Sequence, residues 1–301
     1  DLINTIEKKA KSVDGVIKTG RTHLMDAMPI NFSEELSAWS SQLRASNEMI
    51  DIIANKFLIL PQGGTAVGSG INAHKQFSRY FSQEITKLYP GNYKFIPSKN
   101  FYHELSSQDC SVQLSGELKN LAVILMKISN DLRWMNSGPL TGLSEIELKA
   151  LQPGSSIMPG KVNPVIPEAV AMASADVIGN DTSITIAAQS GSFQLNVMLP
   201  VIAYNLLKSI NLMAGSMSVL SQKAIKSFRV NVKNLETSLS KNPILVTALN
   251  PIIGYESAAA IAKKAYKENR PIIDVASEET DIPIAKLKKL LDPTKLSKGG
   301  I

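Results

Sequence analysis

The chain has 301 residues, of which 44% are hydrophobic and 19% are charged, so it can bury a substantial core and does not have the composition of a disordered chain. Its single cysteine, Cys110, excludes an internal disulfide framework and a cysteine-based zinc cluster. We therefore expect the protein in a reducing compartment, by default the cytoplasm, with an organelle matrix such as the mitochondrial matrix as the alternative. No apolar run approaches the roughly 20 residues that span a bilayer, and the net charge of +6 comes mainly from scattered lysines rather than a basic stripe, so we expect neither membrane nor nucleic acid as a partner.

Helical periodicity dominates the sequence. Weaker helical patterns cover residues 30–58, 72–88 and 164–178, while strand-like alternation is scarce and short. Two stronger patterns run from Leu114 to Leu132 and from Ile202 to Leu220, with apolar residues every three or four positions, which is typical of long bundle helices. The predicted fold class is therefore all-α, a bundle of long helices with irregular connections.

The segment LAVILMKI, residues 121–128, is apolar nearly all round, so we expect several partners to bury it. After about residue 230 the helical patterns become shorter. The sequence therefore predicts a central helical bundle domain over residues 1–230 and a small C-terminal helical domain over residues 231–301.

A long connection contains the stretch PGSSIMPGKVNP, residues 153–164. It is not a phosphate-binding loop, because five residues separate its glycines where that motif needs four, and no hydrophobic strand precedes it. GGTAVGSG, residues 63–70, lacks the strand and helix alternation of a dinucleotide fingerprint. The chain's three histidines are widely separated, so we predict no metal site; they are His23, His74 and His103.

The loop has the residues of an anion site. Flexible backbone at Gly154 and Gly160 can direct N–H groups at one anion, and Asn163 before Pro164 is suited to begin a helix. Lys161 adds a full positive charge, in whose field a serine hydroxyl can lose its proton at lower cost than in water. The structural alternative, a loop that only caps a helix, remains open on these grounds.

The segment GSSIMPGKVNP closely resembles the signature of the fumarase and aspartase superfamily. Further matching segments extend the resemblance over essentially the whole chain: TGRTHLMDAMP at 19–29, GGTAVGSGIN at 63–72, KISNDLRWMNSGP at 127–139, QLNVMLPVI at 194–202 and LVTALNPIIGY at 245–255. The resemblance implies the superfamily's long-helix bundle, a dicarboxylate substrate such as malate or fumarate, no metal or organic cofactor, and a homotetramer whose sites are shared between subunits. It also implies a preceding N-terminal domain with an SSND-type motif, which this chain does not contain.

Within the superfamily, two positions favour class II fumarases. His23 stands where some aspartases have glutamine, and Gly160 where some have alanine. In contrast, VNPVIPE at 162–168 is at least as similar to aspartases, and Leu140 replaces an arginine common to both. We therefore expect a fumarate hydratase, with an aspartate ammonia-lyase and a catalytically inert, tetramer-forming fragment as alternatives; argininosuccinate and adenylosuccinate lyases differ around the loop lysine.

The resemblance also implies the roles of individual residues. Ser155 takes the C3 proton of malate, which leaves an aci-carboxylate intermediate. His23, partnered by Glu168, assists departure of the hydroxyl group. The substrate carboxylates are bound by three further residues, Thr22, Lys161 and Asn163. For His23 the alternative is a structural histidine, and for Glu168 a carboxylate that only complements a helix N-terminus; for His74 and His103 we expect structural roles, and for Cys110 a small core position.

Overall fold

The computed structural model describes residues 1–299 and divides into two compact units. Unit 1 comprises residues 1–40 and 131–164 together with the chain from residue 221, and unit 2 comprises residues 41–130 and 165–220. Helices make up most of both units, and the described strands are short. The all-α prediction is confirmed.

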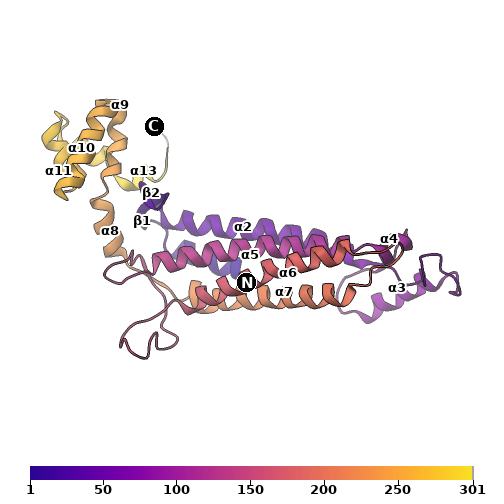
Figure 1. The fold of residues 1–301 in the computed structure, drawn as a ribbon. Coiled ribbons are helices and arrows are strands. Elements are labelled where there is room, and N and C mark those ends of the chain that lie inside the picture. Colours follow the sequence, from indigo (N-terminus) through magenta and orange to yellow (C-terminus); the bar gives the residue numbers. More distant parts are fainter. Residues whose placement is uncertain (300–301) are drawn as a thin grey trace. The chain divides into compact units, whose positions relative to one another are not determined.

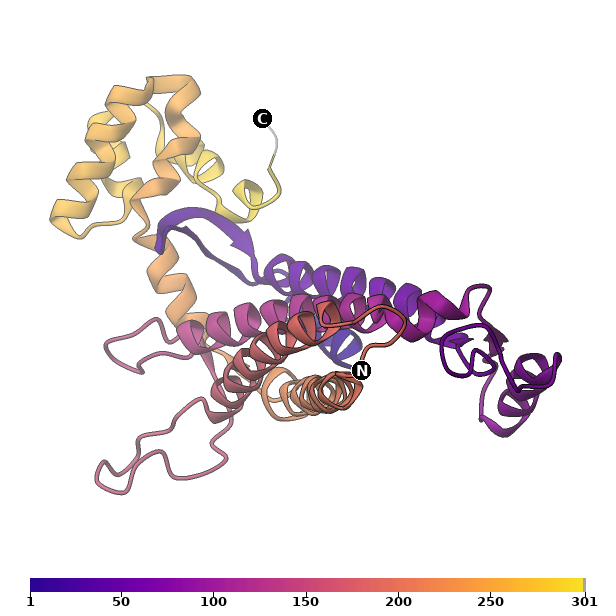
Figure 2. The ribbon, with the colours of Figure 1, turned by 45° about the vertical axis from the view of Figure 1, so that its right-hand side comes forward.

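Unit 2 contains the long helices of the bundle. Its elements, two of which continue into unit 1, are α2 (Phe32–Ala54), η1 (Asn55–Leu58), β3 (Ile59–Leu60), α3 (Phe77–Leu88), β4 (Ile96–Pro97), α4 (Phe101–Ser106), α5 (Asp109–Met135), α6 (Val165–Gln189) and α7 (Leu199–Val219). In both views the unit 2 parts of α2, α5, α6 and α7 run alongside one another (Figures 1 and 2). The two strongest sequence patterns thus form α5 and α7, as predicted.

The apolar stripe of α5 faces the bundle core. Leu118, Leu121, Leu125 and Ile128 are all at most 5% exposed. Val123 in the middle of the apolar segment is 53% exposed, so a single chain does not cover this segment on every side. Cys110, expected as a core residue, is only half-buried, at the start of α5.

Polar pairs also fasten the bundle helices of unit 2. Asp181 of α6 accepts hydrogen bonds from Ser115 Oγ at 2.7 Å and from Lys119 Nζ at 2.6 Å, both on α5. Asn180 donates to Ser209 of α7 at 3.2 Å. Because these polar groups are paired inside the helix contacts, they fix which faces meet rather than oppose burial.

Unit 1 begins with a helix and a hairpin that sequence periodicity did not reveal. Helix α1 (Leu2–Ser12) precedes the antiparallel strands β1 (Ile17–Thr22) and β2 (Met25–Asn31). The two turn residues, His23 and Leu24, have φ of 55° and 60°, as a two-residue hairpin turn requires. The register shifts between Thr19 and Arg21, where Gly20 approaches the partner strand so closely that a Cβ would lie 2.7 Å from the Met28 carbonyl oxygen.

The remaining elements of unit 1 are short. They are β5 (Ile146–Glu147), η2 (Leu220–Ile225), β6 (Arg229–Val230), α8 (Val232–Ser240), η3 (Pro243–Leu249), α9 (Asn250–Ile253), α10 (Tyr255–Glu268), α11 (Ile272–Glu279), α12 (Ile284–Leu290) and α13 (Pro293–Leu296). Strand β5 pairs with β6, so the connection after α5 is tied to the chain just before α8.

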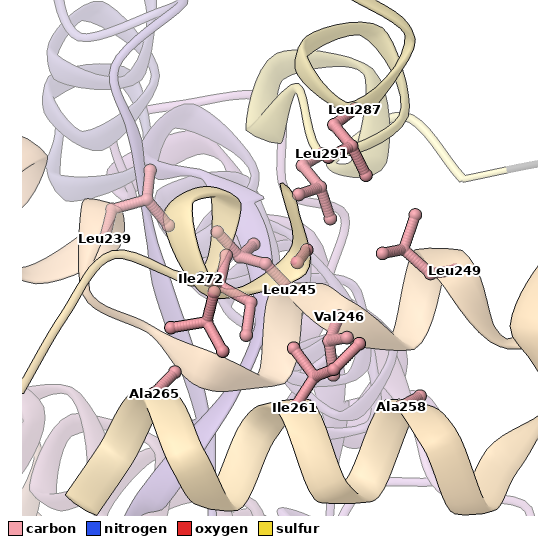
Figure 3. Packing of buried hydrophobic residues seen from close by; sticks show 12 residues of the cluster. Leu239, Leu245, Val246, Leu249, Ala258, Ile261, Ala265, Ile272, Leu287 and Leu291 are labelled. Carbon is pink, nitrogen blue, oxygen red and sulfur yellow. The ribbon is translucent and has the colours of Figure 1, made fainter. Parts of the chain in front are cut away.

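The short helices after residue 231 share an apolar core. Figure 3 shows Val246 of η3, Ile261 of α10 and Leu287 of α12 among the side chains that gather there, and all three are at most 4% exposed. This agrees with the predicted change to short helices. The domain boundary between residues 230 and 231 stays a prediction. Among the described residues, none of the helices combines the length and apolarity needed to cross a bilayer.

His103 of α4 provides a test of local electrostatics. Its Nε2 lies 2.8 Å from Asp109 Oδ2, and its Nδ1 lies 3.2 Å from Glu104 Oε1. The hydrogen bond to Asp109 is the main reason why the pKa of His103 is raised above its ordinary value of 6.5. Because the folded-state pKa is the higher one, this contact stabilises the fold fully below pH 6.5, and the contribution is lost as the pH rises through the folded-state pKa.

We therefore expect His103→Gln to lower the thermal midpoint at pH 5.5 and to leave it unchanged at pH 9. The loss is below about 1 kcal/mol because solvent screens a side chain that is 49% exposed. Differential scanning fluorimetry of both proteins at both pH values measures the effect, with Asp109→Asn as the matched removal of the partner. Equal losses at the two pH values would contradict the assignment.

Candidate functional site

Thr22 and His23 lie at the tip of the β1–β2 hairpin. Thr22 is the last residue of β1, and His23 is the first residue of the turn. Both are exposed, as are Leu24 and Met25 beside them. The hairpin therefore presents an imidazole and a hydroxyl group outward, which argues against the alternative of a buried structural histidine.

The signature loop closes on itself through backbone contacts. Gly154 N–H donates to the Lys161 carbonyl oxygen at 3.0 Å, and Lys161 N–H donates to the Met158 carbonyl oxygen at 3.2 Å. A Cβ on Gly154 would lie 2.3 Å from the Lys161 oxygen, so the close approach requires glycine. Gly160 has φ of 81°, the left-handed conformation that glycine adopts without strain. The two glycines thus shape the loop, but the Gly154 N–H group bonds within the loop and does not point outward to an anion as expected.

Ser155 is held by the backbone that follows it. Its Oγ accepts hydrogen bonds from the N–H groups of Ile157 and Met158, each at 3.2 Å. Two donors directed at one oxygen stabilise negative charge on it, so they favour the alkoxide form of the hydroxyl group. The neighbouring Ser156 is exposed and lacks this pair of donors.

Lys161 and Asn163 complete the loop. Within residues 1–299, the exposed Lys161 ammonium group has no carboxylate partner, so its charge is available to an anion. Asn163 was predicted to cap the next helix, but α6 begins at Val165. The Asn163 side chain instead donates from Nδ2 to the Gly154 carbonyl oxygen at 2.8 Å and so joins the two ends of the loop.

Glu168 occupies the first turn of α6. It belongs to unit 2, whereas His23 and the loop belong to unit 1. Its position near a helix N-terminus fits the simple dipole role that the sequence left open. The pairing of Glu168 with His23 therefore stays a prediction.

The structure brings together the residues of the loop but not the hairpin residues with them. Among residues 1–299, no hydrogen bond or ion pair joins Thr22 or His23 to Ser155, Lys161 or Asn163. In both views, the connection between α5 and α6 and the tip of the hairpin lie apart (Figures 1 and 2). One chain therefore presents two separate halves of the predicted site.

Two hollows in unit 1 lie away from these residues. One, of about 450 Å³, is lined by α1 together with Gln222 and Lys226. The other, of about 440 Å³, lies among α8, η3, α11 and α13. In the part of the chain that the structure describes, no group of three or more His, Cys, Asp or Glu side chains is arranged to hold a metal ion.

Sequence analysis missed the charged residues that anchor the hairpin. Lys18 is 2% exposed and lies 2.7 Å from Glu35 and 2.6 Å from Glu145, while Arg21 lies 2.6 Å from the other oxygen of Glu145. The available signal was weak. Arg21 belongs to the TGRTH segment and Lys18 directly precedes it, but charged residues in a polar segment are usually exposed to solvent.

The structure is thus a helical protein of long bundle helices with a glycine-bounded loop, and the loop carries a serine that accepts two backbone hydrogen bonds, an asparagine and an exposed lysine. Comparison with known families identifies the family to which the chain belongs. The family model described as "Lyase" matches residues 1–179, and the one described as "Fumarase C C-terminus" matches residues 245–298. The chain belongs to this lyase family, and the resemblance seen in the sequence is thereby confirmed.

Individual relatives agree with this assignment. The chain is 59% identical to "Fumarate hydratase class II 2" of Pseudomonas aeruginosa, over 100% of this chain and 65% of that protein. It is 53% identical to "Fumarate hydratase class II" of Xylella fastidiosa, over 98% of this chain and 62% of that protein. A crystal structure of recombinant class II fumarase from Schistosoma mansoni matches with a TM-score of 0.93 and 35% identity, over 98% of this chain and 64% of that one. The chain thus spans less than two thirds of the length of these relatives.

Proposed function

We propose that this protein is a class II fumarate hydratase, a carbon–oxygen lyase that interconverts malate and fumarate. The observation that carries the proposal is the loop geometry. Ser155 Oγ accepts two backbone N–H groups in the same loop that carries the unpaired Lys161 charge. A base and a concentrated positive potential in one loop suit removal of a proton from a carbon next to a carboxylate. The names of the relatives, fumarate hydratase class II, support the same activity.

In the proposed reaction, the Ser155 alkoxide takes a proton from C3 of malate. The electron pair of that C–H bond moves into the adjacent carboxylate and gives the aci-carboxylate intermediate. This intermediate carries more negative charge than the substrate, so the Lys161 ammonium group stabilises it more strongly. Asn163 holds the loop closed and binds a substrate carboxylate.

The hydroxyl group then leaves from C2 as the C2–C3 double bond forms. It needs one proton to depart as water, and the proposed donor is His23, with Glu168 as the group that would orient the imidazole. Thr22, at the same hairpin tip, is proposed to bind a substrate carboxylate. No step in this scheme requires a metal or organic cofactor, and that absence stays a prediction.

We further propose a homotetramer in which His23 and Ser155 of one site come from different chains. The separation of the hairpin tip and the loop supports this, because one chain alone offers two half-sites. The exposed apolar side chains of α7 support it as well: Val201 is 40% exposed, Tyr204 69% and Leu207 60%. Helices that leave such side chains uncovered gain stability from partners of the same kind. Action in the tricarboxylic acid cycle and location in the cytoplasm belong to the same proposal.

The deciding experiment measures fumarate formation by ultraviolet absorbance with the full-length protein, offering malate and aspartate in parallel. We expect malate to be turned over and aspartate not. Turnover of aspartate alone would identify an aspartate ammonia-lyase and overturn the interpretation of His23. Turnover of neither substrate by a folded tetramer would favour the inert alternative.

A further inference from the structure

A largely buried network of four charged side chains joins strand β1 of the hairpin to α2 and to Glu145. The Lys18 ammonium group contacts Glu35 of α2 and Glu145, and it also lies 4.9 Å from the centre of the Phe32 ring. Arg21 contacts the second oxygen of Glu145 at 2.6 Å. Two cations thus balance two carboxylates. Because the Glu145 carboxylate bridges both cations of strand β1, its position fixes theirs.

Glu145 is itself fixed by the backbone around it. Its N–H donates to the Met135 carbonyl oxygen at 2.8 Å, and its carbonyl oxygen accepts from Asn231 N–H at 2.9 Å. Its side chain is 3% exposed. A carboxylate held in this way has little freedom to follow a moving partner, so it acts as an anchor for the strand rather than as a mobile counter-ion.

Arg21 is the anchored residue closest to the hairpin tip. It lies two positions before His23, directly after the register shift at Gly20. On the other strand, Asn242 donates to the Ala27 carbonyl oxygen at 2.8 Å. In the described part of the chain, no side-chain hydrogen bond holds residues 22–25. The Arg21–Glu145 contact is therefore the side-chain interaction nearest to the tip.

We propose that the Arg21–Glu145 ion pair is a positioning device for Thr22 and His23. The inference rests on the proposed function, because a site shared between subunits needs the exposed tip held where a neighbouring chain can use it. In this proposal Arg21 and Glu145 make no contact with the substrate. They act through strand β1, which leads to Thr22 and His23. A displacement of about 1 Å at a reacting group lowers turnover by about 10²-fold.

The test uses the full-length protein with Arg21→Gln, Arg21→Lys and a matched control, Arg229→Gln. Arg229 also pairs with a glutamate, Glu147, but both of these side chains lie on the surface. Two readouts are combined: kcat and KM for malate, and hydrogen exchange of the backbone amides in residues 17–31. Arg21 contacts Oε1 of Glu145 and Lys18 contacts Oε2, so replacement of Arg21 leaves the Lys18–Glu145 pair in place.

We expect Arg21→Gln to lower kcat/KM by about 10- to 100-fold and to speed amide exchange in residues 22–25 about tenfold, with the tetramer and the exchange of α5 unchanged. Arg21→Lys should recover most of the activity, and Arg229→Gln should match the wild type. An Arg21→Gln variant whose amide exchange in residues 22–25 equals that of the wild type would overturn the inference. A loss of activity that is fully explained by a smaller fraction of folded protein would also overturn it. If the wild type does not turn over malate, the proposed function fails, and the exchange measurement still decides whether Arg21 holds the tip.

Discussion

Replacing Ser155 by alanine is expected to lower kcat for malate by about 10²- to 10⁴-fold while the protein folds and assembles normally. The side chain lost is the proposed base, and its Oγ accepts hydrogen bonds from two backbone N–H groups that stabilise the alkoxide. The loop keeps its other contacts, because Gly154 N–H and Asn163 Nδ2 bond to carbonyl oxygens that the change does not remove. Steady-state rates of fumarate formation measure the effect.

Ser156→Ala is the matched control. It removes the same atom from the adjacent residue, whose hydroxyl group is exposed, and turnover should stay within about threefold of the wild type. A Ser155→Ala enzyme that keeps more than about a tenth of wild-type turnover would remove Ser155 from the base role.

The same variant reports on how the site is assembled. If the hairpin and the loop of one site come from different chains, co-expression of Ser155→Ala with His23→Asn produces some sites with both residues intact. Random mixing would restore up to about a quarter of wild-type turnover, although each variant alone is inactive. No recovery in mixed tetramers of confirmed composition would indicate that one chain supplies both residues.

The long helices were predictable because their burial follows one period. Leu118, Leu121, Leu125 and Ile128 repeat at three- and four-residue steps, and all of them face the core of unit 2. The short helices after residue 231 were recognised for the same reason. Local spacing is enough where one apolar stripe decides the structure.

The hairpin was not predicted, because its structure depends on local backbone geometry and on charged residues that are distant in the sequence. Gly20 and the turn at His23 and Leu24 depend on backbone conformations that hydrophobic periodicity does not report. The sequence around Lys18 is typical of a surface lysine. In the structure Lys18 is buried because it pairs with Glu35 and Glu145, which are distant in the sequence. Asn163 shows the same limit on a smaller scale, since it was predicted as a helix cap but closes the loop instead.

The contacts of the loop depend on residue types in a short contiguous stretch. Gly154 bonds to Lys161, and Ser155 accepts hydrogen bonds from Ile157 and Met158, all within that stretch, so a local pattern can point to them. The relation of this loop to His23 and Glu168 is different. It depends on how separate segments, and in our proposal separate chains, come together, which no local pattern encodes.

Lys18→Met is expected to cause the largest loss of stability, about 3–5 kcal/mol. Methionine can fill the apolar part of the volume, but Glu145 and Glu35 lose the cation that lies 2.6 and 2.7 Å from them. Arg21 still neutralises Glu145, so the cost comes from the uncompensated charge of Glu35, whose side chain is 23% exposed. The thermal midpoint should fall on the order of 10 °C, measured by differential scanning calorimetry.

Two further variants show whether the loss arises from unpaired charge or from altered packing. Lys264→Met removes a lysine that also contacts two glutamates, Glu278 and Glu279, but in an exposed position, so the midpoint should change little. Lys18→Met combined with Glu35→Gln leaves Arg21 and Glu145 as a balanced pair and should recover part of the loss. A double variant that is no more stable than Lys18→Met alone would show that the loss arises from packing around Phe32 and Met135. In that case the charge balance of the network would not explain the loss of stability.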